Sequence, residues 1–162
     1  MKNKIIAIIL AIVCLACLAA CGEDGGKTDG FDSFFVKYNG VEIKLGAKAD
    51  SVLDGLGEAQ SKTEIGDCGG LGAQVKYSYA SFDLYVLEVK GGDSIVDQIT
   101  FRDDIITTPE GVYLGMTLDE AEGLLGEPTT KTDKAALYSD GTYTLKLSVA
   151  DGVITEINYI TN

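Results

Sequence analysis

The sequence contains no histidine and no tryptophan, only two prolines, and 13 basic residues against 25 acidic ones in a length of 162. The lack of histidine removes the commonest general base, the Ser–His and Cys–His pairs of nucleophilic catalysis, and the commonest zinc ligand. We therefore expect that the chain is not an enzyme and that it holds no metal and no cofactor. A hydrolase that works with carboxylates alone is the one catalytic class left open.

Basic residues are too few to balance the acidic ones, and the net charge is −12 at pH 7. So acidic a surface repels both nucleic acid and anionic lipid headgroups. Nucleic acid is therefore not an expected partner, and a membrane is expected to hold the chain only through a lipid anchor. Solubility outside the cytoplasm is the simplest explanation of the acidity.

The N-terminus has the pattern of a secretory leader. Lys2 and Lys4 precede an uncharged apolar run from 5 to 20, which is shorter than the ~20 residues of a membrane-spanning helix. The ending Leu18-Ala19-Ala20-Cys21 resembles the lipobox of bacterial lipoproteins, which implies cleavage before Cys21 and lipidation of its thiol. We expect residues 1–20 to be a signal peptide, and the mature chain to be lipid-anchored on the extracytoplasmic face of the cell membrane.

The four cysteines leave a single free thiol. Cys14 and Cys17 lie in the leader and Cys21 is assigned to the lipid, so Cys68 remains alone and no intrachain disulfide is expected. There is no histidine to deprotonate Cys68, and no lysine or arginine adjoins it in the sequence. A buried, structural thiol is therefore favoured over a reactive one.

After a glycine-rich, charged tether at 21–33, the sequence repeats itself. Ile43–Gly46 recurs 69 residues later as Val112–Gly115, and Ile95–Phe101 recurs 58 residues later as Val153–Tyr159. A repeat that keeps its order while its loops change in length is typical of a duplicated supersecondary unit. We predict repeat 1 at 34–104, a connection at 105–109 and repeat 2 at 110–162.

Local signals give each repeat the order β-α-β-β-β. In the second repeat a short strand is predicted at 112–114, and Thr117 with Glu120 forms a capping box for a helix that Gly126 ends. Apolar and polar residues alternate over 142–149, and a last strand follows at 153–159. In the first repeat, Asn39-Gly40 predicts a hairpin before the helix. The predicted fold is α+β: two tandem repeats that form a continuous antiparallel sheet with the helices on one face.

Three apolar side chains are the candidate partner-binding residues: Phe82, Leu84 and Val86. The alignment of 85–89 with the alternating 145–149 puts them on the open face of the sheet, where an apolar patch is the usual mark of a protein-binding surface. Packing against the second repeat or the hairpin is the alternative. The predicted helix-side residues are Ile43, Leu45, Leu56, Tyr85, Leu87, Val89, Ile99, Phe101, Leu114, Leu118, Leu125, Leu145, Leu147, Ile157 and Tyr159.

The second repeat carries a family resemblance. Gly-Met-Thr-Leu-Asp-Glu-Ala at 115–121, Leu-Leu-Gly-Glu-Pro at 124–128 and a strand with Asp-Gly-Val-Ile-Thr-Glu-Ile at 151–157 resemble the SmpA/OmlA and β-lactamase-inhibitor-like fold. The resemblance extends over about 35–162, and the chain is also similar to uncharacterised tandem lipoproteins of Gram-positive anaerobes. It implies binding rather than catalysis, as an enzyme inhibitor in one branch and as an outer-membrane assembly accessory in another.

The leading hypothesis from the sequence is a membrane-tethered, extracytoplasmic binding module without catalysis. It is expected to recognise an envelope or secreted protein, or a peptide, through the open face of its sheet. The alternative is a small-ligand or metal-binding envelope lipoprotein, which is suggested by the excess of acid and by the loop around Asp67 and Cys68.

Overall fold

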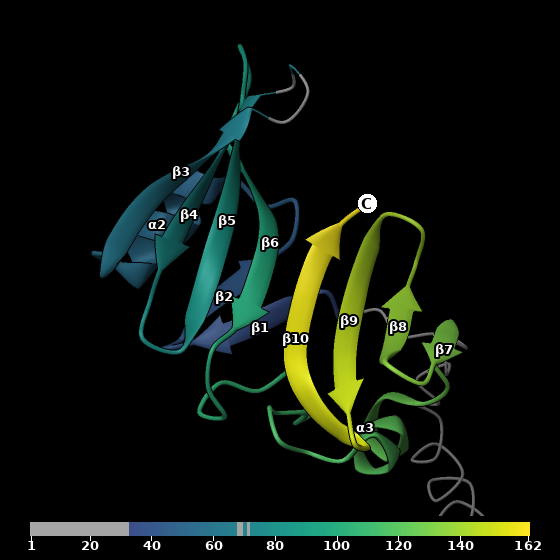
Figure 1. Ribbon diagram of the computed structural model, residues 1–162. Helices are drawn as coiled ribbons and strands as arrows, with labels where there is room; N and C mark the ends of the chain where they lie inside the picture. Colours follow the sequence, from purple (N-terminus) through teal and green to yellow (C-terminus); the bar gives the residue numbers. More distant parts are fainter. Residues whose placement is uncertain (1–32, 68–69, 71) are drawn as a thin grey trace, which may run out of the picture.

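The computed structural model describes residues 33–67, 70 and 72–162 (Figure 1). The leader, Cys21 with its predicted lipid and the predicted quiet thiol of Cys68 lie outside the described residues. The elements, in chain order, are β1 (Phe35–Tyr38), β2 (Val41–Lys44), α2 (Ala49–Leu56), β3 (Ser61–Asp67), β4 (Gly72–Ser78), β5 (Phe82–Val89), β6 (Ile95–Phe101), α3 (Leu118–Leu125), β7 (Thr130–Thr132), β8 (Ala135–Ser139), β9 (Tyr143–Ala150) and β10 (Val153–Thr161).

Antiparallel sheet dominates this α+β fold. Eight strands form one sheet in the order β3-β4-β5-β6-β10-β9-β8-β7, while β1 and β2 pair separately. The sheet therefore consists of two four-stranded meanders that meet at the pairing of β6 with β10, as Figure 1 shows. Each meander follows one of the two helices in the sequence.

Two hairpin turns form where the sequence predicts them. Asn39 and Gly40 join β1 to β2 with φ values of 50° and 84°, and Asp151 and Gly152 join β9 to β10 with 52° and 78°. Two successive residues with positive φ give the turn a twist that matches the twist of the flanking strands. Asparagine, aspartate and glycine tolerate that conformation better than other residues do.

The two helices differ in how they begin, as their sequences predict. The capping box of α3 is confirmed, because the Glu120 N–H donates to Thr117 Oγ1 at 3.3 Å and the Thr117 N–H donates to Glu120 Oε2 at 3.1 Å. Lys48 precedes α2 and makes no side-chain capping bond. A glycine with positive φ follows each helix, Gly57 after α2 and Gly126 after α3.

The predicted strand at 112–114 is wrong, because this segment forms no strand. Its counterpart in the first half is β2, which pairs with β1. The second half has no second strand of that kind beside it, so Val112 closes a loop instead. Its N–H donates to Thr108 Oγ1 at 3.1 Å, and its carbonyl accepts from the Thr108 N–H at 2.9 Å.

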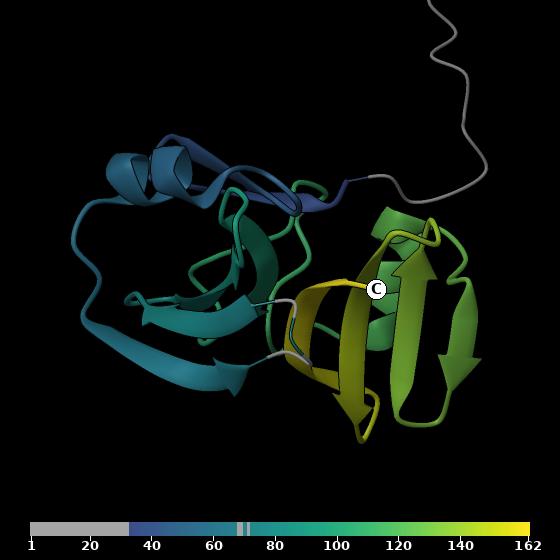
Figure 2. The same ribbon diagram turned by 90° about the horizontal axis from the view of Figure 1, so that it is seen from above.

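The core is one cluster between the sheet, the β1–β2 hairpin and both helices. The hairpin lies across both meanders, as Figure 2 shows from above. At one end Tyr38 meets Phe82 of β5 edge-on, with ring centroids 5.0 Å apart. At the other end Phe34 meets Tyr143 of β9, with centroids 5.7 Å apart. The hairpin thus ties the two halves of the chain into one core.

The predicted faces of β5 are reversed in the structure. Phe82, Leu84 and Val86 are at most 1% exposed and belong to the core, whereas Tyr85 and Leu87 are only half-buried. The pairing explains the error. Leu84 lies opposite Ile99, and Leu147 lies opposite Ile157, so the equivalent residues of β5 and β9 are 63 positions apart rather than the 60 of the sequence alignment. An odd shift moves every side chain to the other face.

Most of the other predicted helix-side residues do lie in the core or pack against it. Nine of them are buried: Ile43, Leu45, Ile99, Phe101, Leu118, Leu145, Leu147, Ile157 and Tyr159. Leu56, Leu114 and Leu125 are partly buried against the cluster. In β10 a bulge between Ile154 and Glu156 leaves Thr155 without a partner in the register, and Ile154 rather than Val153 is therefore the buried residue at its start.

Equivalent hydrogen bonds occur in the two halves of the chain. Gly46 donates to the Val96 carbonyl at 2.8 Å, and Gly115 donates to the Ile154 carbonyl at 2.9 Å. These donors are 69 residues apart and these acceptors 58, which are the offsets of the sequence repeat. Two further bonds recur at the same offsets: Val96 to Ala47 and Ala49 to Ser94, with Ile154 to Met116 and Leu118 to Gly152.

Candidate functional site: the outer face of the sheet

We call the sheet surface opposite the hairpin and the core the outer face. No described helix or strand covers it in Figures 1 and 2. Strand register fixes its members, because Tyr85, Gln98, Ile160 and Thr144 lie opposite one another in turn across four strands. A neighbouring row runs through both halves in the same way: Asp83, Thr100, Asn158, Lys146 and Leu137.

The residues predicted to bind a partner do not belong to this face. Phe82 and Leu84 are 0% exposed and Val86 is 1% exposed, with Phe82 stacked on the Tyr79 ring at a centroid distance of 4.9 Å. Side chains so enclosed in the core offer a partner no surface to contact. The prediction that they form an exposed patch is therefore wrong, and the alternative, that they pack inside the protein, holds.

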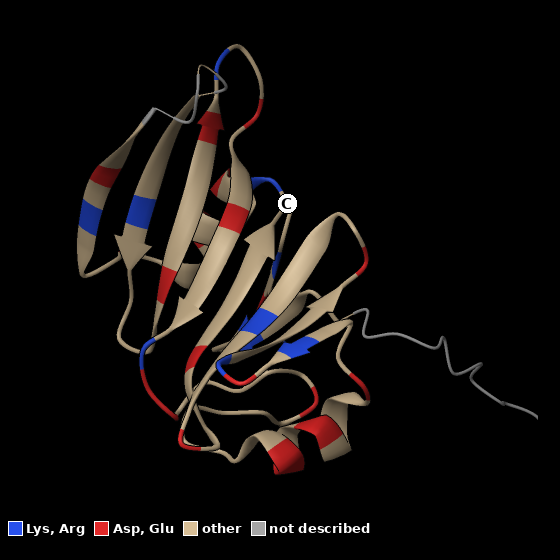
Figure 3. Cartoon of the chain, turned by 45° about the vertical axis from the view of Figure 1, so that its right-hand side comes forward, with Lys and Arg blue, Asp and Glu red and all other residues tan. Residues whose placement is uncertain are grey.

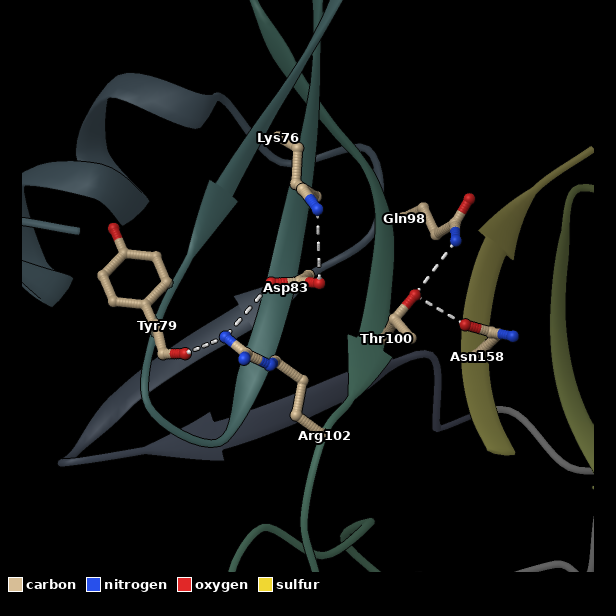
Figure 4. A network of polar contacts seen from close by, with 7 residues as sticks. All are labelled: Lys76, Tyr79, Asp83, Gln98, Thr100, Arg102 and Asn158. Atoms are coloured by element: carbon tan, nitrogen blue, oxygen red, sulfur yellow. Dashed lines mark hydrogen bonds and ion pairs between the residues drawn. The ribbon is translucent and has the colours of Figure 1, made fainter. Parts of the chain in front are cut away.

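A chain of polar side chains crosses the junction between the two meanders (Figure 4). Gln98 Nε2 donates to Thr100 Oγ1 at 3.0 Å, and Thr100 Oγ1 donates to Asn158 Oδ1 at 2.6 Å. Thr100 and Asn158 lie directly opposite each other on β6 and β10. Asn158 is only 5% exposed although no element covers it, so its neighbours crowd closely around it. The centre of the outer face is therefore polar and internally hydrogen-bonded.

One end of the outer face carries an acid between two cations, also drawn in Figure 4. Lys76 Nζ lies 3.8 Å from Asp83 Oδ2, and Arg102 Nη1 lies 3.7 Å from Asp83 Oδ1. Both distances are longer than hydrogen bonds, and Asp83 Oδ1 has no hydrogen-bond donor among the described residues. Arg102 instead donates to the Tyr79 carbonyl at 3.1 Å. The local charge is thus one cation in excess on a largely acidic protein.

Two titratable groups on this face have shifted pKa values. The pKa of Tyr85 is raised, chiefly because burial disfavours its anion and then because Asp83 repels that anion. The pKa of Glu156 is lowered, first by the hydrogen bond from Ser148 and then by that from Asn158. Ser148 Oγ donates to Glu156 Oε2 at 2.8 Å. At neutral pH the face therefore presents a neutral tyrosine and an ionised glutamate.

Half-buried apolar side chains lie beside this polar centre. Leu87 of β5 and Ile95 of β6 are paired directly across the sheet, and Tyr85 and Ile160 both flank Gln98. These residues come from the first meander and from β10. An apolar area bordered by hydrogen-bonding and charged groups is typical of surfaces that bind proteins.

The sequence does contain a signal for this surface, although its interpretation is reversed. Both faces of β5 are apolar, and only one can point into the core. Either set of residues is therefore a candidate for exposure, and the strand partners decide between them. The polar centre gives no local sequence signal, because Thr100 and Asn158 are 58 residues apart and meet only when β6 pairs with β10.

A separate open groove of about 790 Å³ lies beside the start of α3. Residues of the β7–β8 and β9–β10 turns complete its walls, and three carboxylates line it: Asp119, Asp133 and Asp151, with Lys131 among them. Figure 3 shows acidic residues on α3 and in the surrounding loops. Within residues 33–67, 70 and 72–162, no three His, Cys, Asp or Glu side chains are placed to hold a metal ion together.

Comparison of the chain with protein-family models, with curated proteins and with solved structures gave no match. The resemblance to the SmpA/OmlA and β-lactamase-inhibitor-like fold therefore stays a prediction. Neither of the described helices, α2 or α3, is long and apolar enough to cross a membrane.

Proposed function

We propose that the chain is a lipid-anchored, extracytoplasmic binding module that engages an envelope or secreted protein through the outer face. The observation that carries this proposal is the uncovered face of the eight-stranded sheet, where half-buried Tyr85, Leu87, Ile95 and Ile160 adjoin a polar, hydrogen-bonded centre. The lipobox-like Leu18–Cys21 supports the anchor, and the histidine-free composition supports binding without catalysis.

We further propose that the two halves are copies of one unit, each with its helix on the core side of the sheet. Supporting it are the hydrogen bonds that recur at offsets of 69 and 58. A tyrosine also donates to the glycine carbonyl after each helix, Tyr79 to Gly57 at 3.3 Å and Tyr138 to Gly126 at 3.2 Å. Two copies joined by their last strands share one core and conceal two sheet edges.

The outer face suits a protein better than a small molecule. The cavity of useful depth lies elsewhere, beside α3, while the outer face offers extended rows that cross from β4 to β8. A partner that covers Leu87 and Ile95 would bury apolar area, which is the main source of affinity in protein interfaces. Polar groups such as Lys146 and Glu156 would fix its orientation.

Site-specific photo-crosslinking in the producing cells tests the binding surface. A photoreactive residue at Leu87 or Ile160, both on the outer face, should trap one and the same protein. The matched control is Leu124 of α3, which is 48% exposed and lies off this face. Equal trapping from Leu124, or no protein trapped from either outer-face position, would count against the proposal.

The anchor is tested separately by Cys21→Ser. The substitution should abolish lipidation and leave the leader attached, because the lipid is attached through the thiol. Mass spectrometry of the N-terminal peptide distinguishes the lipidated from the uncleaved form. An unmodified Cys21 in the wild-type protein, or a mature N-terminus elsewhere, would refute the proposed localisation without affecting the crosslinking result.

The groove beside α3 favours a second candidate function, the binding of a small cationic ligand. Asp119, Asp133 and Asp151 give it excess negative charge over Lys131. Isothermal titration with Ca²⁺, Zn²⁺ and small diamines should then give heat that Asp151→Asn reduces. No heat with any of these ligands would leave the outer face as the only proposed site.

A further inference from the structure

We propose that the outer edge of β3 pairs antiparallel with β3 of a second copy of the chain, about a two-fold axis at Thr63. The two ends of the large sheet differ in a way that singles out this strand. β7, at one end, has three residues, whereas β3, at the other, has seven, and its residues 61–66 are all exposed. A long exposed edge is a template for another strand, and a very short one is not.

The backbone of β3 presents its free groups at a defined place. The Tyr79 N–H donates to the Phe82 carbonyl, so odd-numbered residues of β4 bond toward β5. Successive residues of a strand bond to opposite sides, and Lys76 of β4 therefore bonds toward Thr63, its partner in β3. The N–H and carbonyl groups of Lys62 and Glu64 consequently point away from the sheet, where a further strand would meet them.

Charge selects one register for a second copy. With Thr63 opposite Thr63 of the other copy, each Lys62 lies opposite a Glu64, and both pairs attract. A shift by two residues in either direction puts Lys62 opposite Lys62 or Glu64 opposite Glu64. Odd shifts are excluded because the outward backbone groups would not meet. Figure 3 shows this basic and acidic pair along the strand at the left edge of the sheet.

Charged side chains on an edge strand ordinarily discourage pairing. Lys62 and Glu64 discourage it with most sequences, but they complement a second β3. The pairing zone is short, since a bulge between Glu64 and Gly66 ends the regular register. So small an interface gives weak association in dilute solution. Confinement of two anchored copies to one membrane raises their effective concentration, which is where pairing is expected.

Disulfide trapping in membranes of the producing cells tests the register, with the full chain and Cys68→Ser as background. In the proposed pair, Thr63 faces its copy in a non-hydrogen-bonded position with Cα atoms about 4.5 Å apart, so Thr63→Cys should crosslink on oxidation. Ser61→Cys is the control on the same face of the strand. Its two copies would lie four residue steps apart, about 14 Å, and should not crosslink.

Charge reversal in the Thr63→Cys background tests the selection. Lys62→Glu and Glu64→Lys should each lower the crosslink yield about tenfold, since each makes both pairs repulsive. The double variant Lys62→Glu/Glu64→Lys should restore the yield. The single variants change the net charge in opposite directions, so an effect of overall charge would raise the yield of one and lower that of the other.

A Thr63→Cys yield no higher than that of Ser61→Cys would overturn the proposal. So would a double variant that stays as low as the single ones. Neither result depends on the outer face, because crosslinking from Leu87 reports a different protein on a different surface. The two proposals therefore succeed or fail independently.

Discussion

Replacement of Leu84 and of Leu87 by alanine gives a matched test of which face of β5 is the core. The two residues are three apart on one strand and lose the same atoms. Leu84 is fully buried, opposite Ile99, and Leu87 is half-buried, opposite Ile95. The sequence pattern alone predicts the reverse of what the structure implies, since it puts Leu84 on the open face.

The expected magnitudes follow from this burial. Leu84→Ala should lower the free energy of unfolding by about 2–5 kcal/mol, because the enclosed site cannot fill the cavity. Leu87→Ala should lower it by about 1 kcal/mol or less, since half of the side chain is already in water. A domain with roughly 5–15 kcal/mol of stability would survive the second change easily and the first only in part.

Urea denaturation followed by circular dichroism measures both variants. With a slope of about 2 kcal/mol/M, Leu84→Ala should move the midpoint down by at least about 1 M, and Leu87→Ala by about 0.5 M or less. The slope itself should stay constant. Equal shifts for the two variants, or a larger shift for Leu87→Ala, would refute the assignment of the faces.

Two further predictions concern the ends of secondary-structure elements. Thr117→Ala should cost about 1 kcal/mol by removing the cap of α3, and it should weaken the loss of stability on acidification, because hydrogen bonds from Thr117 lower the pKa of Glu120 in the folded chain and this stabilisation is present above the unfolded pKa and lost as pH falls through the folded one. Denaturation midpoints between pH 3 and 7 check both effects, and an unchanged pH dependence would contradict the second. Gly46→Ala should destabilise more than Gly115→Ala, since both have positive φ but only at Gly46 would the added Cβ meet Tyr143 Oη; thermal melts should show the difference shrinking in a Tyr143→Phe background, and a constant difference would exclude that contact as its cause.

Signals that depend on a few adjacent residues are read correctly from the sequence. The capping box at Thr117, the turn at Asn39-Gly40 and the turn at Asp151-Gly152 each form as predicted. The alternating strand at 143–149 also forms, because its apolar and polar residues occupy separate faces. In all four cases the favourable conformation is set by groups within about four residues of each other.

Features that depend on distant partners are not read correctly. The strand predicted at 112–114 has no neighbour to pair with, and the bulge at Thr155 shifts the buried residue to Ile154. The hairpin that joins Phe34 to Tyr143 across more than a hundred residues has no local sequence pattern. Each of these is decided by tertiary pairing, which a local pattern does not contain.

The error on β5 carries information about binding. A strand whose two faces are both apolar is ambiguous, because the core needs only one of them. At the structural offset of 63, Tyr85 corresponds to Ser148 and Asp83 to Lys146, so the outer face is more apolar in the first half of the chain than at the same places in the second. Folding requires no such difference between two halves that pack alike. The surplus apolar residues, Tyr85 and Leu87, are therefore where we expect a partner to make its main contact.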